Sequence, residues 1–157
     1  MDESRALLRH IVATVAYRAG KALRDAPADF ASYKVSPSSR TPAEILSHMG
    51  DLFDWALSMA NGAPGWKPAA PQPWDHEVAR FFDALTRFDT RLSQDAPLGA
   101  PASQLFQGPI ADSLTHVGQL ALLRRTAGAP VKGENYFKAD IAIGRTGAQQ
   151  SAPRIEF

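Results

Sequence analysis

Apolar residues recur at intervals of three and four along four stretches of this chain, with polar residues between them. This spacing puts the apolar side chains on one face of a helix, because an α-helix makes one turn in about 3.6 residues. The pattern predicts four helices, at about residues 3–25, 42–61, 75–94 and 103–127. The fold class is therefore all-α. In the first helix the apolar face consists of Leu8, Ile11, Val12, Val15, Ala19, Ala22 and Leu23.

The second helix has the clearest start signal in the chain. Thr41, Pro42 and Glu44 form the pattern of a capping box, with a hydroxyl at the N-cap, proline at the first helical position and glutamate at the third. Asn61 and Gly62 supply the stop. Between these signals the apolar face consists of Ile45, Met49, Leu52, Phe53, Ala56 and Met59.

Proline separates the second helix from the third. Residues 63–73 read APGWKPAAPQP, and their four prolines exclude a helix or a central strand. This segment is predicted to be a long crossover loop of a four-helix bundle. The third helix follows it, with Asp75 as a candidate N-cap. Its apolar face consists of Val78, Phe81, Phe82, Leu85, Phe88 and Leu92.

The start of the fourth helix is open at this stage. It begins either near Ser103 or at Pro109, where Gly108 and Pro109 would start the helix or kink it. Residues 128–157 are rich in Gly and Pro and are predicted to form an extended tail packed on the bundle.

Length and composition narrow the classes of protein. A chain of 157 residues fits one domain, at 1–157, and its net charge of +1 without any block of like charge argues against general binding of nucleic acid or membrane surfaces. No targeting segment or membrane span is visible, so a cytoplasmic location is expected. There is no Cys, so any metal site must use His and carboxylate ligands.

Three residues are candidate metal ligands. His48 lies three residues after Ile45 and four before Leu52, which turns its imidazole toward the interior. Asp112 and His116 are four apart on the fourth helix and share one face. Two imidazoles and a carboxylate suit Zn, Ni, Fe or Mn. The alternative is a metal-free pair in which His48 and Asp112 are hydrogen-bonded, with Asp112 near a helix start.

Other polar residues are candidates for supporting roles. Gln119, one turn beyond His116, could orient a ligand. Glu134 and Tyr136 follow the fourth helix and could fold over the mouth of the bundle to move a proton, or could simply anchor the tail. Trp66 is interpreted as a loop anchor, because no glycine-rich phosphate loop accompanies it.

At these residues the chain resembles the DinB/YfiT-like superfamily. The resemblance is carried by ILSHMGDLFDWALSMANG, with an interior histidine, and by ADSLTHVGQLALLRRTAG, and it extends to GENYFKADI. It implies a four-helix bundle with a long crossover, a homodimer, and a metal held by one His on the second helix and two on the last. His48 and His116 match the first and last ligands. Asp112 stands where the superfamily has a histidine.

The resemblance also implies a class of reaction. Members of the superfamily transfer groups with a low-molecular-weight thiol such as mycothiol or bacillithiol, or catalyse related isomerisation and hydrolysis. A divalent ion makes a thiol or a water more acidic, and here any thiolate must arrive with a cosubstrate. Two alternatives remain: a non-catalytic, metal-free helical-bundle dimer, and a protein that binds a small ligand between its helices.

Overall fold

The computed structural model describes residues 2–157, and its regular secondary structure is helical. The long helices are α1 (Glu3–Leu23), α2 (Pro42–Ala60), α3 (Trp74–Ser93) and α5 (Ala111–Thr126), with the short α4 (Ala102–Leu105) before α5. No strand is present among residues 2–157, where Glu134 and Glu156 form one isolated β-bridge. The predicted all-α class is confirmed. Among the same residues, no helix is long and apolar enough to cross a membrane.

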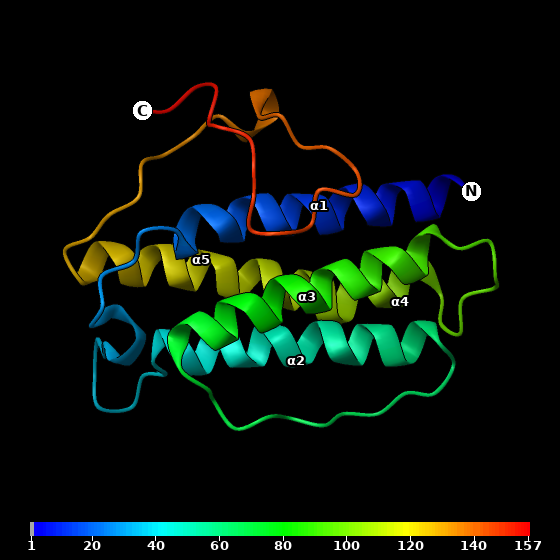
Figure 1. The fold of residues 1–157 in the computed structure, drawn as a ribbon, viewed down its shortest axis with the longest axis horizontal. Coiled ribbons are helices and arrows are strands. Elements are labelled where there is room, and N and C mark those ends of the chain that lie inside the picture. The colour runs from blue at the N-terminus through cyan, green and yellow to red at the C-terminus, as the bar shows by residue number, and fades with distance from the viewer. Residues whose placement is uncertain (1) are drawn as a thin grey trace.

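The long helices lie side by side and run in two directions. The proline-rich segment 61–73 runs back along α2 to the start of α3, so α2 and α3 point the same way (Figure 1). α1 and α5 point the opposite way (Figure 1). The long crossover loop predicted from the prolines is therefore present between α2 and α3.

Apolar faces of all the long helices meet in one core. The predicted faces of α2 and α3 supply much of it: Phe53 lies 6.0 Å, ring centre to ring centre, from both Phe81 and Phe88. Burial of such aromatic and aliphatic side chains is the main source of stability for a bundle. The largest apolar side chains that are fully buried are Phe30, Phe53, Phe81, Phe88, Leu46, Met49, Leu85, Leu92, Leu105, Ile110 and Leu120.

The starts of α2 and α3 are both predicted from local sequence signals, with different outcomes. The predicted capping box is confirmed: the Thr41 hydroxyl accepts from the Glu44 amide at 3.2 Å, and Glu44 Oε2 accepts from the Thr41 amide at 2.7 Å. This backbone hydrogen bond lowers the pKa of Glu44. The prediction of Asp75 as an N-cap is wrong. α3 begins one residue earlier, with Pro73 at the cap, and Trp74 packs against Phe30.

The open question about the fourth helix is answered by a π-helical turn. Helix α4 begins at Ala102, passes through the π-turn Phe106–Ile110 and continues as α5. Pro109 has no N–H to donate within a helix. The Ala111 amide donates to the Phe106 carbonyl, five residues back, so the helical path continues through the proline.

Buried carboxylates hold the crossover loop against the bundle. Asp51 on α2 accepts from the Ala69 amide at 3.2 Å, and Glu77 on α3, which is fully buried, accepts from the Gln72 amide at 2.8 Å. Arg80 forms ion pairs with both carboxylates. These charged hydrogen bonds hold a segment that has no regular secondary structure of its own.

The C-terminal tail is fastened to α1. Tyr17 donates to Glu134 Oε1 at 2.6 Å, and Lys21 pairs with Glu134 at 2.9 Å and with Glu156 at 2.8 Å. Burial, together with the hydrogen bond to Glu134, raises the pKa of Tyr17. As expected, the tail is largely irregular chain that packs on the bundle, and it lies over α1 (Figure 1).

We predict that Glu77→Ala lowers the free energy of unfolding by about 2–3 kcal/mol, because it leaves a loop amide and part of the Arg80 charge without an acceptor. Urea unfolding measures this loss. Asp83→Ala, on the exposed side of α3, removes a surface pair with Arg87 and should cost less than about 0.5 kcal/mol. Equal losses in the two variants would contradict the anchoring role of Glu77.

Candidate metal centre

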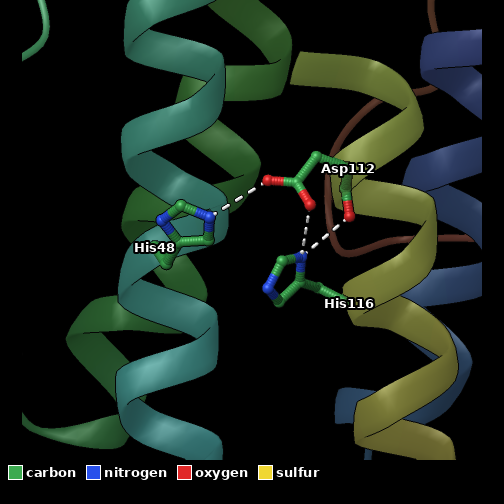
Figure 2. Close-up of side chains that lie close together, drawn as sticks. All are labelled: His48, Asp112 and His116. Atoms are coloured by element: carbon green, nitrogen blue, oxygen red, sulfur yellow. Dashed lines mark hydrogen bonds and ion pairs between the residues drawn. The ribbon is translucent and has the colours of Figure 1, made fainter. Parts of the chain in front are cut away.

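His48, Asp112 and His116 come together between α2 and α5. Figure 2 shows His48 extending from α2 and the other two side chains from α5, all toward the space between the helices. One ligand atom of each residue lies within 4.8 Å of the others. The group is accessible from solvent mainly at Asp112, whose side chain is 43% exposed, against 24% for His48 and 10% for His116.

Helical spacing explains the convergence. Ile45 and Leu52, one turn before and after His48, are buried, so His48 extends from the inward face of α2. Asp112 and His116 are one turn apart on α5 and therefore lie above one another. The space between α2 and α5 receives one side chain from the first helix and two from the second.

Asp112 bridges the two imidazoles. His48 Nε2 lies 3.2 Å from Asp112 Oδ2, where its N–H donates to the carboxylate. His116 Nδ1 lies 3.3 Å from the other oxygen, Oδ1. The ring centres of the two histidines are 4.8 Å apart. The Asp112 carboxylate therefore accepts a hydrogen bond from His48 on α2 and also faces the imidazole of His116 on its own helix, α5.

The orientation of His116 is set by the backbone. Its Nδ1 donates to the main-chain carbonyl of Asp112 at 2.8 Å. In the neutral ring this contact places the proton on Nδ1 and leaves Nε2 with a free lone pair. A backbone acceptor on the far nitrogen is the usual way in which a protein orients a histidine ligand.

The ligand types suit a divalent transition metal, but the distances between the donor atoms are longer than in a bound site. Two imidazole nitrogens and a carboxylate oxygen are ligands of zinc and related metals. Bonds of about 2.0–2.1 Å around a tetrahedral ion separate neighbouring donors by about 3.3 Å, whereas these atoms spread to 4.8 Å. Binding therefore requires the side chains to close on the ion, and the half-exposed Asp112 has the most room to move.

The crossover loop covers one side of the group with an aromatic ring. Trp66 packs edge-on against His48, with ring centres 5.7 Å apart, and against Trp55 on α2 at 5.8 Å. Trp66, which is predicted to anchor the loop, contacts Trp55 and His48, is itself 46% exposed, and forms a wall beside His48. Its position comes from the hydrogen bonds of the loop and has no signal in the periodic pattern of the sequence.

Two cavities adjoin the histidines. The first, of about 350 Å³, is called the α5 cavity and is lined by His116, Gln119, Ile45, Leu122 and Arg40, among others. The second, of about 370 Å³, is called the crossover cavity and is lined by His48, Trp66, Ser47 and Arg40, among others. Arg40 lines both. Arg40 has no signal in the sequence pattern, because it lies in an irregular segment before the capping box.

Of the residues predicted to support the site, Gln119 lies beside His116. Gln119 lines the α5 cavity with His116, but the hydrogen bond that the structure describes for the His116 ring goes to the main-chain carbonyl of Asp112. Asp112 therefore orients His116, in the role expected of Gln119.

Glu134 and Tyr136 lie with α1. Glu134 is bound by Tyr17 and Lys21, and Tyr136 packs on Tyr17 and lines a cavity beside Val117. Val117 and its neighbours form the face of α5 that is turned away from the His116 face. The structure therefore does not bring these two candidates for proton transfer to the histidines, and they hold the tail.

Comparison of the chain with models of protein families, with curated proteins and with solved structures finds no match. The candidate site therefore rests on its own geometry.

The hydrogen bonds predict opposite tautomers for the two imidazoles in metal-free protein. We expect the proton on Nδ1 of His116 and on Nε2 of His48, at a pH at which both rings are neutral. Long-range ¹H–¹⁵N NMR spectra distinguish the two forms. In Asp112→Ala the main-chain carbonyl remains, so His116 should keep its tautomer while His48 loses its acceptor. The same tautomer in both rings of the unsubstituted protein would contradict this arrangement.

Proposed function

We propose that the protein binds a divalent transition metal ion through His48, Asp112 and His116. The observation that carries the proposal is the convergence of these three donors from two helices within 4.8 Å. Zn, Ni, Fe and Mn are the candidate ions, since each accepts a mixed set of imidazole and carboxylate ligands. Three protein ligands leave coordination positions open, which is typical of catalytic metal sites.

The structure supports separate roles for residues of the group. The Asp112 carbonyl holds His116 with Nε2 available, and Trp66 shields His48 on the loop side. The Asp112 carboxylate has to exchange its hydrogen bond from His48 for a bond to the ion, so His48 Nε2 must lose its proton on binding. A divalent ion at this site would make a thiol or a water more acidic and so supply a nucleophile near neutral pH.

We further propose that the protein is a metal-dependent enzyme of the DinB-like superfamily that transfers groups with a low-molecular-weight thiol of the mycothiol or bacillithiol type. Support comes from the resemblance of the segments around His48 and His116, and from two cavities of suitable size beside them. The chain has no Cys, so the thiol belongs to the cosubstrate.

Metal content tests the site directly. We expect near-stoichiometric transition metal in tag-free protein, by elemental mass spectrometry, and at least about a hundredfold loss of affinity in His48→Ala and in His116→Ala, because each loses one of three ligands. His10→Ala and His76→Ala are the matched controls, since both histidines are exposed and lie outside the group.

The result that contradicts the site is equally definite. If the unsubstituted protein contains no metal and takes up none of Zn, Ni, Mn or Fe on titration, the group is a metal-free, hydrogen-bonded cluster. The same conclusion follows if the His10 and His76 variants lose metal to the same extent as the His48 and His116 variants.

Thiol consumption tests the proposed reaction. With a low-molecular-weight thiol and an electrophilic acceptor, we expect turnover that a chelator abolishes and that re-addition of the metal restores. His48→Ala should lower the rate at least about a hundredfold, and His76→Ala should not change it. A protein that holds metal but consumes no thiol in this assay would favour the ligand-binding alternative over the enzyme.

A further inference from the structure

Arg40 is placed where the two cavities beside the metal group meet. It is an exposed residue just before α2, and it lines the α5 cavity with His116 and the crossover cavity with His48. Arg40 is the one residue that the two linings share. Its position therefore bears on which ligands the group can receive.

The Arg40 charge is not committed to another group. Among residues 2–157, the structure describes no hydrogen bond or close ion pair from its guanidinium. Other arginines are engaged: Arg80 with Asp51, and Arg124 with backbone carbonyls. The pKa of Glu44 is lowered mainly by its hydrogen bonds with Thr41 and only to a smaller extent by the Arg40 charge, and the Glu44 carboxylate accepts from the Thr41 amide. Arg40 thus offers a free bidentate donor.

The residues that line the α5 cavity suit an organic acid. Beyond Arg40 its lining is apolar, through Ile45, Leu122 and Leu123, or neutral and polar, through Ser39 and Gln119, with His116 also among its walls. No carboxylate is among the residues that line it. The crossover cavity, in contrast, is lined by Glu44 and Asp51 as well. An anion is therefore favoured in the α5 cavity.

We propose that the α5 cavity binds the carboxylate of a small organic acid on Arg40, with the apolar body of that acid along Ile45 and Leu122 and its far end toward His116. This inference rests on the proposed function in that it names the class of substrate for the same site. Carboxylate is favoured over phosphate because Arg40 is the one guanidinium or ammonium group among the lining residues, and its single charge balances that of a carboxylate. A dianionic phosphate would need further donors, and Glu44 would repel it.

The test is an NMR titration of ¹⁵N-labelled protein with 3-phenylpropionate and with its neutral amide, 3-phenylpropanamide. In unsubstituted protein we expect saturable shifts at the Gln119 side chain and the Leu122 amide, with the carboxylate bound at least about tenfold more tightly. Arg40→Gln should abolish that preference and leave binding of the amide unchanged. Arg125→Gln is the matched control, since Arg125 is exposed on α5 and is not among the residues that line either cavity.

The titration is run on metal-free protein and again with Zn²⁺ added, so that the two proposals fail separately. One outcome overturns the metal site and supports the acid site: the unsubstituted protein binds no zinc but still prefers the carboxylate, and Arg40→Gln loses this preference. Equal binding of acid and amide, or a preference that survives Arg40→Gln, overturns the acid site whether or not zinc binds. Tighter binding of phenyl phosphate than of 3-phenylpropionate overturns the assignment to carboxylate.

Discussion

The wall that the crossover loop forms beside the candidate site depends on the buried carboxylates that hold this loop. Residues 61–73 have no regular secondary structure, so their position has to come from contacts with the helices. Asp51 and Glu77 supply these contacts by accepting from loop amides, and Arg80 compensates their charge. A buried carboxylate is tolerated only when it is paired in this way. The loop in turn carries Trp66 to His48 and forms a wall of the crossover cavity.

A second constraint is the direction of the helices. The crossover makes α2 and α3 parallel, and the core-facing side of α2 packs against both α3 and α5. His48 lies on the part of that side that faces α5, where Asp112 and His116 meet it. The π-turn before α5 lets the helical path pass through Pro109 without a break. The three donors are thus held by two rigid helices, and the backbone contact of His116 adds a fixed orientation.

The sequence predicts what local spacing controls. α1, α2 and α3 begin and end within two residues of the expected bounds, because periodicity and the Thr41 capping box act over single turns. The expected fourth helix at 103–127 corresponds to α4, the π-turn and α5 taken together. The same helical spacing predicts that His48, Asp112 and His116 share an interior. The sequence places the start of α3 one residue too late, at Asp75, since the packing of Trp74 on Phe30 is a tertiary contact.

The sequence does not predict where irregular segments lie. Glu134 and Tyr136 follow α5 closely, and only the folded tail shows that Tyr17 and Lys21 hold them on the α1 side. Trp66 and Arg40 lie beside the histidines because two irregular segments meet there, the crossover loop and the segment before α2. Periodic patterns carry no information about such contacts, which depend on hydrogen bonds between irregular segments and the packed helices.

Asp112 gives the group its particular chemistry. A site with two imidazoles and one carboxylate carries one positive charge fewer, with a divalent ion, than a site with three neutral imidazoles. The ion then attracts an anionic ligand less strongly, and it acidifies a bound thiol or water less. Recognition of an organic acid would therefore depend more on a fixed cation outside the ligand set. Arg40, at the meeting point of the two cavities, is in the position to supply that charge without entering the coordination sphere.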